Sequence, residues 1–161
     1  MPADYFLKID GIPGESTDAK HKNEIEVQNF VWGEQNTQSP GSGGGGGAGK
    51  VVPSDFQYSS LLTAASPRLM LACATGEHIK NAVLTGRKPG KEQFEFLSIT
   101  FSDVLVSSYQ TAATAEDASG PSEQVSLNFA TLRLALKTQK PDGTLGQTIV
   151  AGYDFKANKK I

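Results

Sequence analysis

The sequence predicts a mainly β fold: a single antiparallel β-barrel with one short flanking α-helix and a long glycine-rich extended loop. Three observations support this prediction. Apolar and polar residues alternate with a period of two along most of the chain, which is typical of strands. A complete set of helix start and stop signals occurs once. One long strand segment changes phase midway, and a bend at such a point lets a sheet curl into a barrel. The length suits one domain, which we place over residues 1–161.

The first strand is expected close to the amino terminus. Tyr5, Leu7 and Ile9 occupy alternate positions, and the residues 11–14 that follow supply glycine and proline for a turn. After a polar segment, residues 25–32 read as a second strand.

The second strand is expected to carry apolar side chains on both faces. We expect its bulky members to enter the barrel core and its smaller ones to point away from the core. The inward pair is Phe30 and Trp32, and the opposite face carries Ile25, Val27, Asn29 and Val31.

The segment 33–53 contains too few large side chains to build a core. It is rich in Gln, Asn, Ser and Gly, with seven glycines between Gly41 and Gly49. We expect an extended loop, because a long segment of this composition is usually functional or disordered.

One helix is expected over residues 66–75. Ser66 is suited to cap it, Pro67 to fill its first position and Gly76 to end it. Residues 69–74 are apolar nearly all round, whereas a surface helix normally keeps a polar face. We therefore expect something beyond the domain's own core to cover this helix.

The rest of the chain reads as strands separated by clusters of Gly, Pro, Ser and Asp. The expected strands cover residues 79–85, 93–101, 104–111, 124–137 and 148–155. Within residues 124–137 the apolar side chains move from odd-numbered to even-numbered positions, which predicts a bulge or bend near Ala130.

The composition excludes several classes of function. Fifteen Lys and Arg oppose seventeen Asp and Glu, with no long basic block to follow a phosphate backbone, so nucleic acid is not an expected partner. No stretch approaches the roughly 18 apolar residues of a membrane span, and the first residues lack the pattern of a cleaved signal peptide. Cys73 is the one cysteine, so we expect neither a disulfide nor a thiolate metal site.

Three patterns suggest chemistry, and each has a simpler reading. Residues 44–50 fit the start of a phosphate-binding loop, but Val51 cannot supply the hydroxyl that holds magnesium. His21 and His78 lack second ligands at metal-binding spacing. The carboxylates of residues 10–18 do not have the spacing of a calcium loop and suit a polar turn. We expect no catalytic, cofactor-binding or metal-binding residues, and no cofactor, and the chain is not expected to be an enzyme.

Many short motifs occur in one order over almost the whole chain: residues 5–11, 14–16, 21, 24–25, 32–33, 43–50, 66–73, 76–78, 104–108, 125–130 and 137–143. Together they resemble the Hcp (haemolysin-coregulated protein) family of type VI secretion systems. The specificity lies in their number and order rather than in any single motif.

The resemblance implies a β-barrel flanked by a helix, assembly into a homo-hexameric ring, and stacking of rings into a tube inside a contractile sheath. It further implies partnership with spike and sheath proteins and with small secreted effectors held in the lumen. The expected location is the bacterial cytoplasm, followed by export to the medium or a target cell without a cleaved signal. Six residues follow the last expected strand, so we expect no appended toxin domain.

Individual residues can be assigned to this expected assembly. Asn29 and Val31 are candidates for the lumen, because they lie on the face opposite Phe30 and Trp32. Subunit or ring contacts are expected from the apolar helix and from the glycine tract: Leu71, Ala74, Gly43, Gly44, Gly45, Gly46 and Gly47.

Two other functions remain open from the sequence. The first is a monomeric barrel that carries a small ligand in its interior. The second is a hydrolase, although the sequence lacks a nucleophile-elbow motif.

Overall fold

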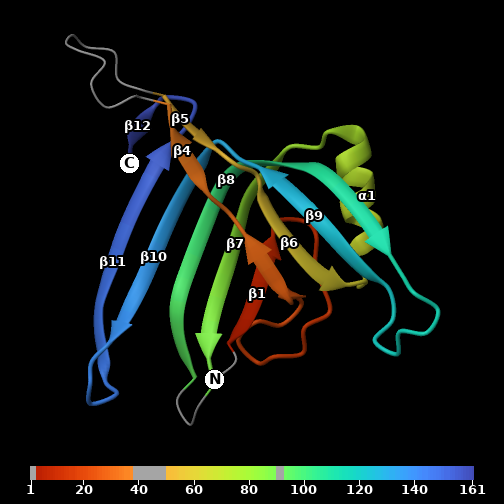
Figure 1. The fold of residues 1–161 in the computed structure, drawn as a ribbon, viewed down its shortest axis with the longest axis horizontal. Coiled ribbons are helices and arrows are strands. Elements are labelled where there is room, and N and C mark those ends of the chain that lie inside the picture. The colour runs from red at the N-terminus through yellow and green to blue at the C-terminus, as the bar shows by residue number, and fades with distance from the viewer. Residues whose placement is uncertain (1–2, 38–49, 90–92) are drawn as a thin grey trace.

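The computed structural model describes residues 3–37, 50–89 and 93–161. Within these residues the fold is mainly β, with antiparallel pairing throughout and one helix, as predicted (Figure 1). The elements are β1 (Asp4–Ile9), β2 (Ile25–Val27), β3 (Asn29–Val31), β4 (Glu34–Asn36), β5 (Val51–Pro53), β6 (Phe56–Leu61), α1 (Ser66–Thr75), β7 (Ile79–Lys88), β8 (Phe94–Ala112), β9 (Ser122–Asn128), β10 (Thr131–Gln139), β11 (Leu145–Asp154) and β12 (Lys159–Lys160).

Two sets of strands share β8. The first set has the order β12-β11-β10-β8-β7-β1-β2, and the second joins β3, β6 and β9 to β8. The amino-terminal part of β8 pairs with β7 and β10, and its carboxyl-terminal part pairs with β9. Asp103, two residues before the part that pairs with β9 begins, has a left-handed φ of 53°. Helix α1 lies against one side of the curled sheet and contacts β8 (Figure 1).

The chain passes between the two strand sets at two further points. At Gln28, β2 gives way to β3, and the Gln28 amide donates to the Ser59 carbonyl at 2.8 Å. At residues 129–130, β9 gives way to β10, with a bend at Ala130 where the sequence predicted one. The ladders run from β2 through β1, β7, β8, β9 and β6 to β3, and the chain passes directly from β2 to β3 at Gln28.

Several expected strands differ from the observed ones. Residues 93–101 and 104–111 form the single strand β8, since the change of direction at Asp103 does not interrupt pairing. Residues 124–137 form two strands rather than one, because the bend at Ala130 moves the chain to the other set. Residues 25–32 also form two strands.

The break at Gln28 corrects the expected faces of the second strand. Ile25 and Val27 are buried, whereas Asn29 and Val31 are exposed, so these four residues do not share one face. Phe30 and Trp32 pack against the core, as expected.

Two further corrections concern residues 33–61. The expected loop 33–53 contains the strand pair β4–β5, in which Gln35 lies opposite Val52. Strand β6 was not predicted, although Phe56, Tyr58 and Ser60 alternate and all three are buried.

The core lies between the curled strands and beneath α1. Its centre is aromatic: the Phe56 ring lies 4.8 Å from Phe101, which lies 4.9 Å from Phe129. Buried aliphatic side chains from β1, β2, β7 and β9 surround these rings: Leu7, Ile25, Leu84, Val125 and Leu127. Because these strands come from distant parts of the sequence, one core holds the whole domain together.

Helix α1 has the predicted bounds but begins differently. Ala65 occupies the N-cap position without a side-chain cap, and the Ser66 hydroxyl accepts from the Thr63 amide at 2.9 Å. The expectation that Ser66 caps the helix is therefore wrong. Gly76 ends the helix in the left-handed conformation (φ 68°) and its amide donates to Ala72, as predicted.

Candidate functional site

The outer face of α1 carries the helix candidates for subunit contact. Leu69 and Ala72 are fully buried against the barrel. Leu71 is 56% exposed and Ala74 is also exposed, so both point away from the core. Met70 is 50% exposed and belongs to the same outer face. The helix therefore presents an apolar outer surface that this copy of the chain leaves uncovered.

The lumen candidates lie next to each other on a short exposed strand. Asn29 pairs with Ser59 and Val31 pairs with Gln57 in the β3–β6 ladder. The Val31 side chain is 60% exposed. Both residues point away from the core, which is necessary for a lumen role but does not establish one.

The glycine candidates for ring contact, Gly43 to Gly47, lie outside the described residues. The β4–β5 pair brings the two ends of that segment together, with Thr37 bonded to the Lys50 carbonyl. The paired strands β4 and β5 lie at the upper edge of the fold (Figure 1).

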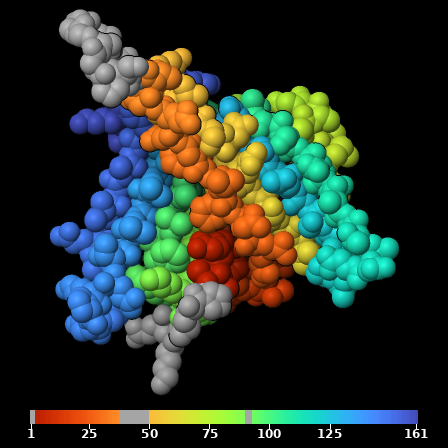
Figure 2. Space-filling view, in the orientation of Figure 1, coloured from red at the N-terminus to blue at the C-terminus, as the bar shows by residue number. Residues whose placement is uncertain are grey.

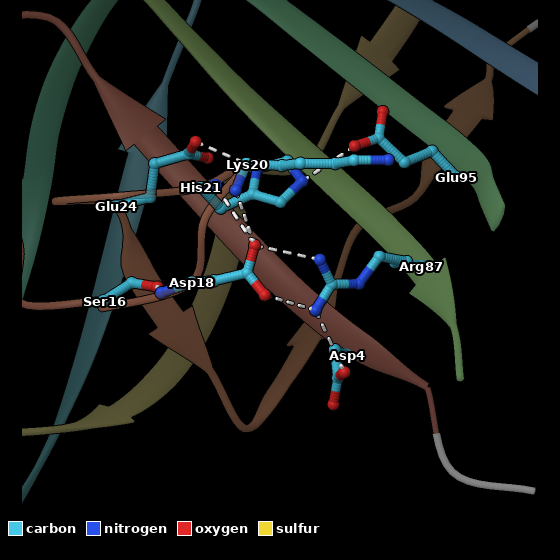
Figure 3. Close-up of polar contacts among 8 residues, drawn as sticks. All are labelled: Asp4, Ser16, Asp18, Lys20, His21, Glu24, Arg87 and Glu95. Carbon is cyan, nitrogen blue, oxygen red and sulfur yellow. Dashed lines mark hydrogen bonds and ion pairs between the residues drawn. The ribbon is translucent and has the colours of Figure 1, made fainter. Parts of the chain in front are cut away.

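The sequence did not predict a polar cluster that anchors the loop between β1 and β2. Arg87, at the end of β7, is 3% exposed. Its guanidinium donates to both carboxylate oxygens of Asp18, at 3.0 and 2.7 Å, and lies 3.5 Å from Asp4 (Figure 3). Paired hydrogen bonds of this kind fix both distance and orientation. Arg87 therefore holds the loop against the start of β1.

Asp18 also organises the loop backbone. Its Oδ1 atom accepts from the amides of Lys20 and His21, which confirms the prediction of a polar turn in this segment. The hydrogen bond from Arg87, and next that from the Lys20 amide, hold the pKa of Asp18 well below its ordinary value. The same contact with Asp18 raises the pKa of Arg87. Both groups therefore remain charged at neutral pH.

His21 is the second member of this cluster. Its ring is buried, and its Nδ1 and Nε2 atoms lie 2.9 Å from Glu24 and 2.8 Å from Glu95 (Figure 3). The ring stacks on Phe6 at 4.5 Å, and the Arg87 guanidinium lies 4.9 Å from the same Phe6 ring. The loop is thus fastened to β7 and β8 by side chains 69 and 74 positions away in the sequence, and to β1 by the Phe6 ring. This arrangement is suited to anchoring a loop, because the Asp18 carboxylate, the His21 ring and the two terminal guanidinium nitrogens of Arg87 are all paired within the cluster, and only Arg87 Nε is buried without a partner among the described residues.

A second buried polar group lies on the second strand set. Glu123 on β9 is 2% exposed and accepts from the Ser60 hydroxyl at 3.1 Å. Desolvation and then the Glu123 carboxylate raise the pKa of Tyr58, and the same causes raise the pKa of Tyr109 to about 12. Both tyrosines therefore stay neutral over the physiological range.

A groove of about 730 Å³ opens beside the anchored loop. Glu15 and Glu26 line it, and both are exposed. The other wall contains Leu61 and Leu62, each 38% exposed. The groove thus combines acidic and apolar side chains.

Strands β10 and β11 extend the first strand set beyond the barrel. Leu134 and Leu136 lie on the same face as the buried Leu132, since alternate residues of a strand share a face. They are nevertheless 38% and 43% exposed, and Ile149, paired with Leu136, is 58% exposed. The core-facing surface therefore continues onto strands that no other described part of the chain covers.

No group of three or more His, Cys, Asp or Glu side chains in residues 3–37, 50–89 and 93–161 is placed to hold a metal ion. Within the same ranges, no helix combines the length and apolar character that a membrane span requires.

Comparisons with known families, sequences and structures agree with one another. The family model described as "Type VI secretion system effector, Hcp" matches residues 6–135. Protein hcp1 of Pseudomonas aeruginosa is 41% identical over 160 residues, covering 98% of each chain. The crystal structure of Hcp1 from Salmonella typhimurium covers 100% of both chains at 38% identity, with a TM-score of 0.82. A structure described as a type six secretion system protein covers 99% of this chain and 100% of its own, at 30% identity and a TM-score of 0.92.

These matches extend over both strand sets, the helix and the uncovered strands β10 and β11. Their length and identity exceed what a shared fold alone would give. The chain belongs to the Hcp family of type VI secretion proteins, a family of structural secretion proteins rather than enzymes.

Proposed function

We propose that the chain is the repeating subunit of the inner tube of a type VI secretion system. Six copies form a ring, rings stack into a tube inside the sheath, and the tube leaves the cell with the spike. The single observation that carries this proposal is family membership along almost the whole chain.

The uncovered apolar surfaces support self-assembly. Leu71 on α1 and Ile149 on β11 are each more than half exposed, and large apolar side chains are costly to leave in water. Obligate interfaces between subunits commonly bury more than about 2,000 Å², with a largely apolar centre. A ring places such surfaces between neighbouring copies.

The lumen of the ring would hold small secreted effectors, and Val31 and Asn29 are the residues we assign to its wall. Their support is exposure on β3 and a direction away from the core. Export takes the protein from the bacterial cytoplasm to the medium or a target cell, without removal of a signal peptide.

Native mass spectrometry of the purified protein tests the proposal. The expected mass is near six times the 17.1 kDa of one chain. A stable monomer at micromolar concentration would contradict the ring and support the alternative of a barrel that carries its ligand alone. Detection of intact protein outside secreting cells, lost when the sheath is removed, tests export.

A further inference from the structure

The ring of His21 lies between two carboxylates on the loop that joins β1 to β2. Its Nδ1 atom is 2.9 Å from Glu24 Oε2, and its Nε2 atom is 2.8 Å from Glu95 Oε1 (Figure 3). An ionised carboxylate only accepts hydrogen bonds, whereas a neutral imidazole has one N–H donor and one acceptor nitrogen. With both carboxylates ionised, the two contacts are therefore both hydrogen bonds only when both ring nitrogens carry protons.

The two carboxylates differ in how easily they can leave the ring. Glu24 is three positions away on the same loop and its side chain is 13% exposed, whereas Glu95 lies on β8 and its side chain is 46% exposed. A neutral ring can donate to only one of them. Leaving a mostly buried carboxylate against a bare nitrogen is costly, whereas Glu95 can turn to solvent. Loss of a ring proton therefore opens the contact with Glu95.

A second attachment of the same loop does not depend on a ring proton. Arg87 donates to both carboxylate oxygens of Asp18. This hydrogen bonding, and next that from the Lys20 amide, hold the pKa of Asp18 well below its ordinary value, so the pair stays charged on both sides of neutral pH. The loop thus has one permanent attachment, to β7, and one attachment, to β8, that requires a protonated ring.

Charged groups surround His21 on every element packed against it. They are Asp18, Lys20, Lys22 and Glu24 on the loop, Asp4 and Lys8 on β1, Arg87 on β7 and Glu95 on β8. Lysine, arginine and carboxylate side chains ordinarily keep their charge between about pH 5 and 8, whereas a histidine ring ordinarily changes its charge in this range. A change of pH across neutrality therefore acts on this cluster through its imidazole ring.

The part of the loop next to His21 forms one wall of a surface pocket. The pocket has a volume of about 490 Å³, and residues 19–20 and 22–24 line it opposite residues 8–13. Figure 2 shows this loop, in red-orange, at the surface beside the red β1. Its backbone is closed by hydrogen bonds from the Asn23 amide to Ser16 and from the Glu24 amide to His21, at 2.8 and 3.2 Å. These amides would become accessible if residues 19–24 moved away from β8.

We propose that His21 is a pH-sensitive fastener of the loop between β1 and β2. When the ring carries two protons, the loop is tied to both β7 and β8. When the pH rises and the ring loses one proton, Glu95 turns to solvent and residues 19–24 loosen. The charge of the ring and its two carboxylates then changes from −1 to −2, so the surface beside the pocket becomes more acidic. The attachment is complete at the lower pH and partly lost at the higher pH.

Hydrogen–deuterium exchange of the full chain at about pH 5.5 and 8.5, followed by mass spectrometry, tests the proposal. Each exchange rate is divided by the rate of an unstructured chain at the same pH, which removes the chemical effect of pH. The amides of Asn23 and Glu24 report on the loop, and those of β7 serve as the internal reference. We expect loop protection to be roughly tenfold lower at the higher pH, as loss of one hydrogen bond to a charged group would give, with β7 unchanged.

Three variants identify the groups responsible. Glu95→Gln should keep high loop protection at both pH values, because an amide can accept from a protonated ring nitrogen and donate to a bare one. His21→Gln removes the ring and should give low protection at both pH values. His78→Gln is the matched control and should behave as the wild type, since His78 is 62% exposed and lies 3.2 Å from Asp103, outside the loop.

Several results would overturn the proposal. These are equal wild-type protection at both pH values, a pH dependence that persists in Glu95→Gln, and a pH dependence that disappears in His78→Gln. If His21→Gln does not fold, the comparison of the wild type with Glu95→Gln still decides. The inference goes beyond the proposed function and does not depend on it, because all the groups belong to one chain. Native mass measured at both pH values tests the ring separately, and a monomer would contradict only the ring.

Discussion

Two leucines on helix α1 provide a matched pair for separating folding from assembly. Leu69 is fully buried, whereas Leu71, two positions later, is 56% exposed. Leu69→Ala should destabilise the protein by about 2–5 kcal/mol, through lost apolar burial and the cavity that remains. Leu71→Ala removes a side chain of which less than half is buried in the single copy, so the expected cost is about 1 kcal/mol or less.

Urea unfolding followed by fluorescence is a suitable assay. Trp32 is the one tryptophan, and its ring lies 6.4 Å from the Phe129 ring beside the core. With a urea m-value of about 2 kcal/mol/M, Leu69→Ala should lower the unfolding midpoint by roughly 1–2.5 M, and Leu71→Ala by about 0.5 M or less. The measurement should be repeated at several protein concentrations, because assembly adds stability that depends on concentration.

The two variants should also differ in native mass. If Leu71 contacts a neighbour, Leu71→Ala should lower the fraction of rings while the dilute protein unfolds almost as the wild type does. Equal midpoint shifts for the two variants in dilute protein would refute the assignment of inward and outward faces of α1.

Three further predictions follow from other parts of the structure. Arg87→Met should lower the unfolding midpoint at pH 7, and the difference from wild type should shrink as the pH falls below about 4. The reason is that the ionised Asp18 carboxylate, whose pKa is lowered in the folded protein, stabilises the fold at pH values above the pKa that it has in the unfolded chain. This stabilisation is lost as the carboxylate becomes protonated at lower pH, and an unchanged difference at pH 2 would argue against this reasoning. Val31→Gln should leave the ring intact and change effector retention in pull-down assays, whereas loss of the ring would place Val31 at an interface. Gly14→Ala should destabilise the loop in urea titrations, because the added Cβ would lie 2.6 Å from the Glu24 carbonyl oxygen, and wild-type stability would contradict that geometry.

Local signals predicted the elements that depend on local interactions. The bounds of α1 follow from Pro67 and Gly76, whose effects on φ and on backbone hydrogen bonds need no tertiary partner. The change of apolar phase located the bend at Ala130, because side chains on each side must face the same core. Strand β6 had the same alternating signal in Phe56, Tyr58 and Ser60, and it could have been found.

The polar cluster could not be predicted in the same way. Arg87 and Asp18 lie 69 positions apart, and His21 and Glu95 lie 74 apart. Each residue taken alone suits an exposed loop or a strand end, and only the pairing of β1 with β7 brings them together. The acidic and apolar groove was missed for the same reason, since Glu26 and Leu61 meet through tertiary structure.

The position of β8 in both strand sets has a consequence for how the chain is made. β1 cannot complete its ladder with β7 until residue 87 exists, and the two sets cannot be joined before β8 is present. At about 5–20 residues per second, a ribosome needs roughly 5–20 s to proceed from β1 to the end of β8. During that interval β1 can pair with β2 but must wait for β7, and the two unfinished sets keep open edges. Because open sheet edges can pair with other chains, we expect the growing chain to be most prone to aggregation before its middle strand has been synthesised.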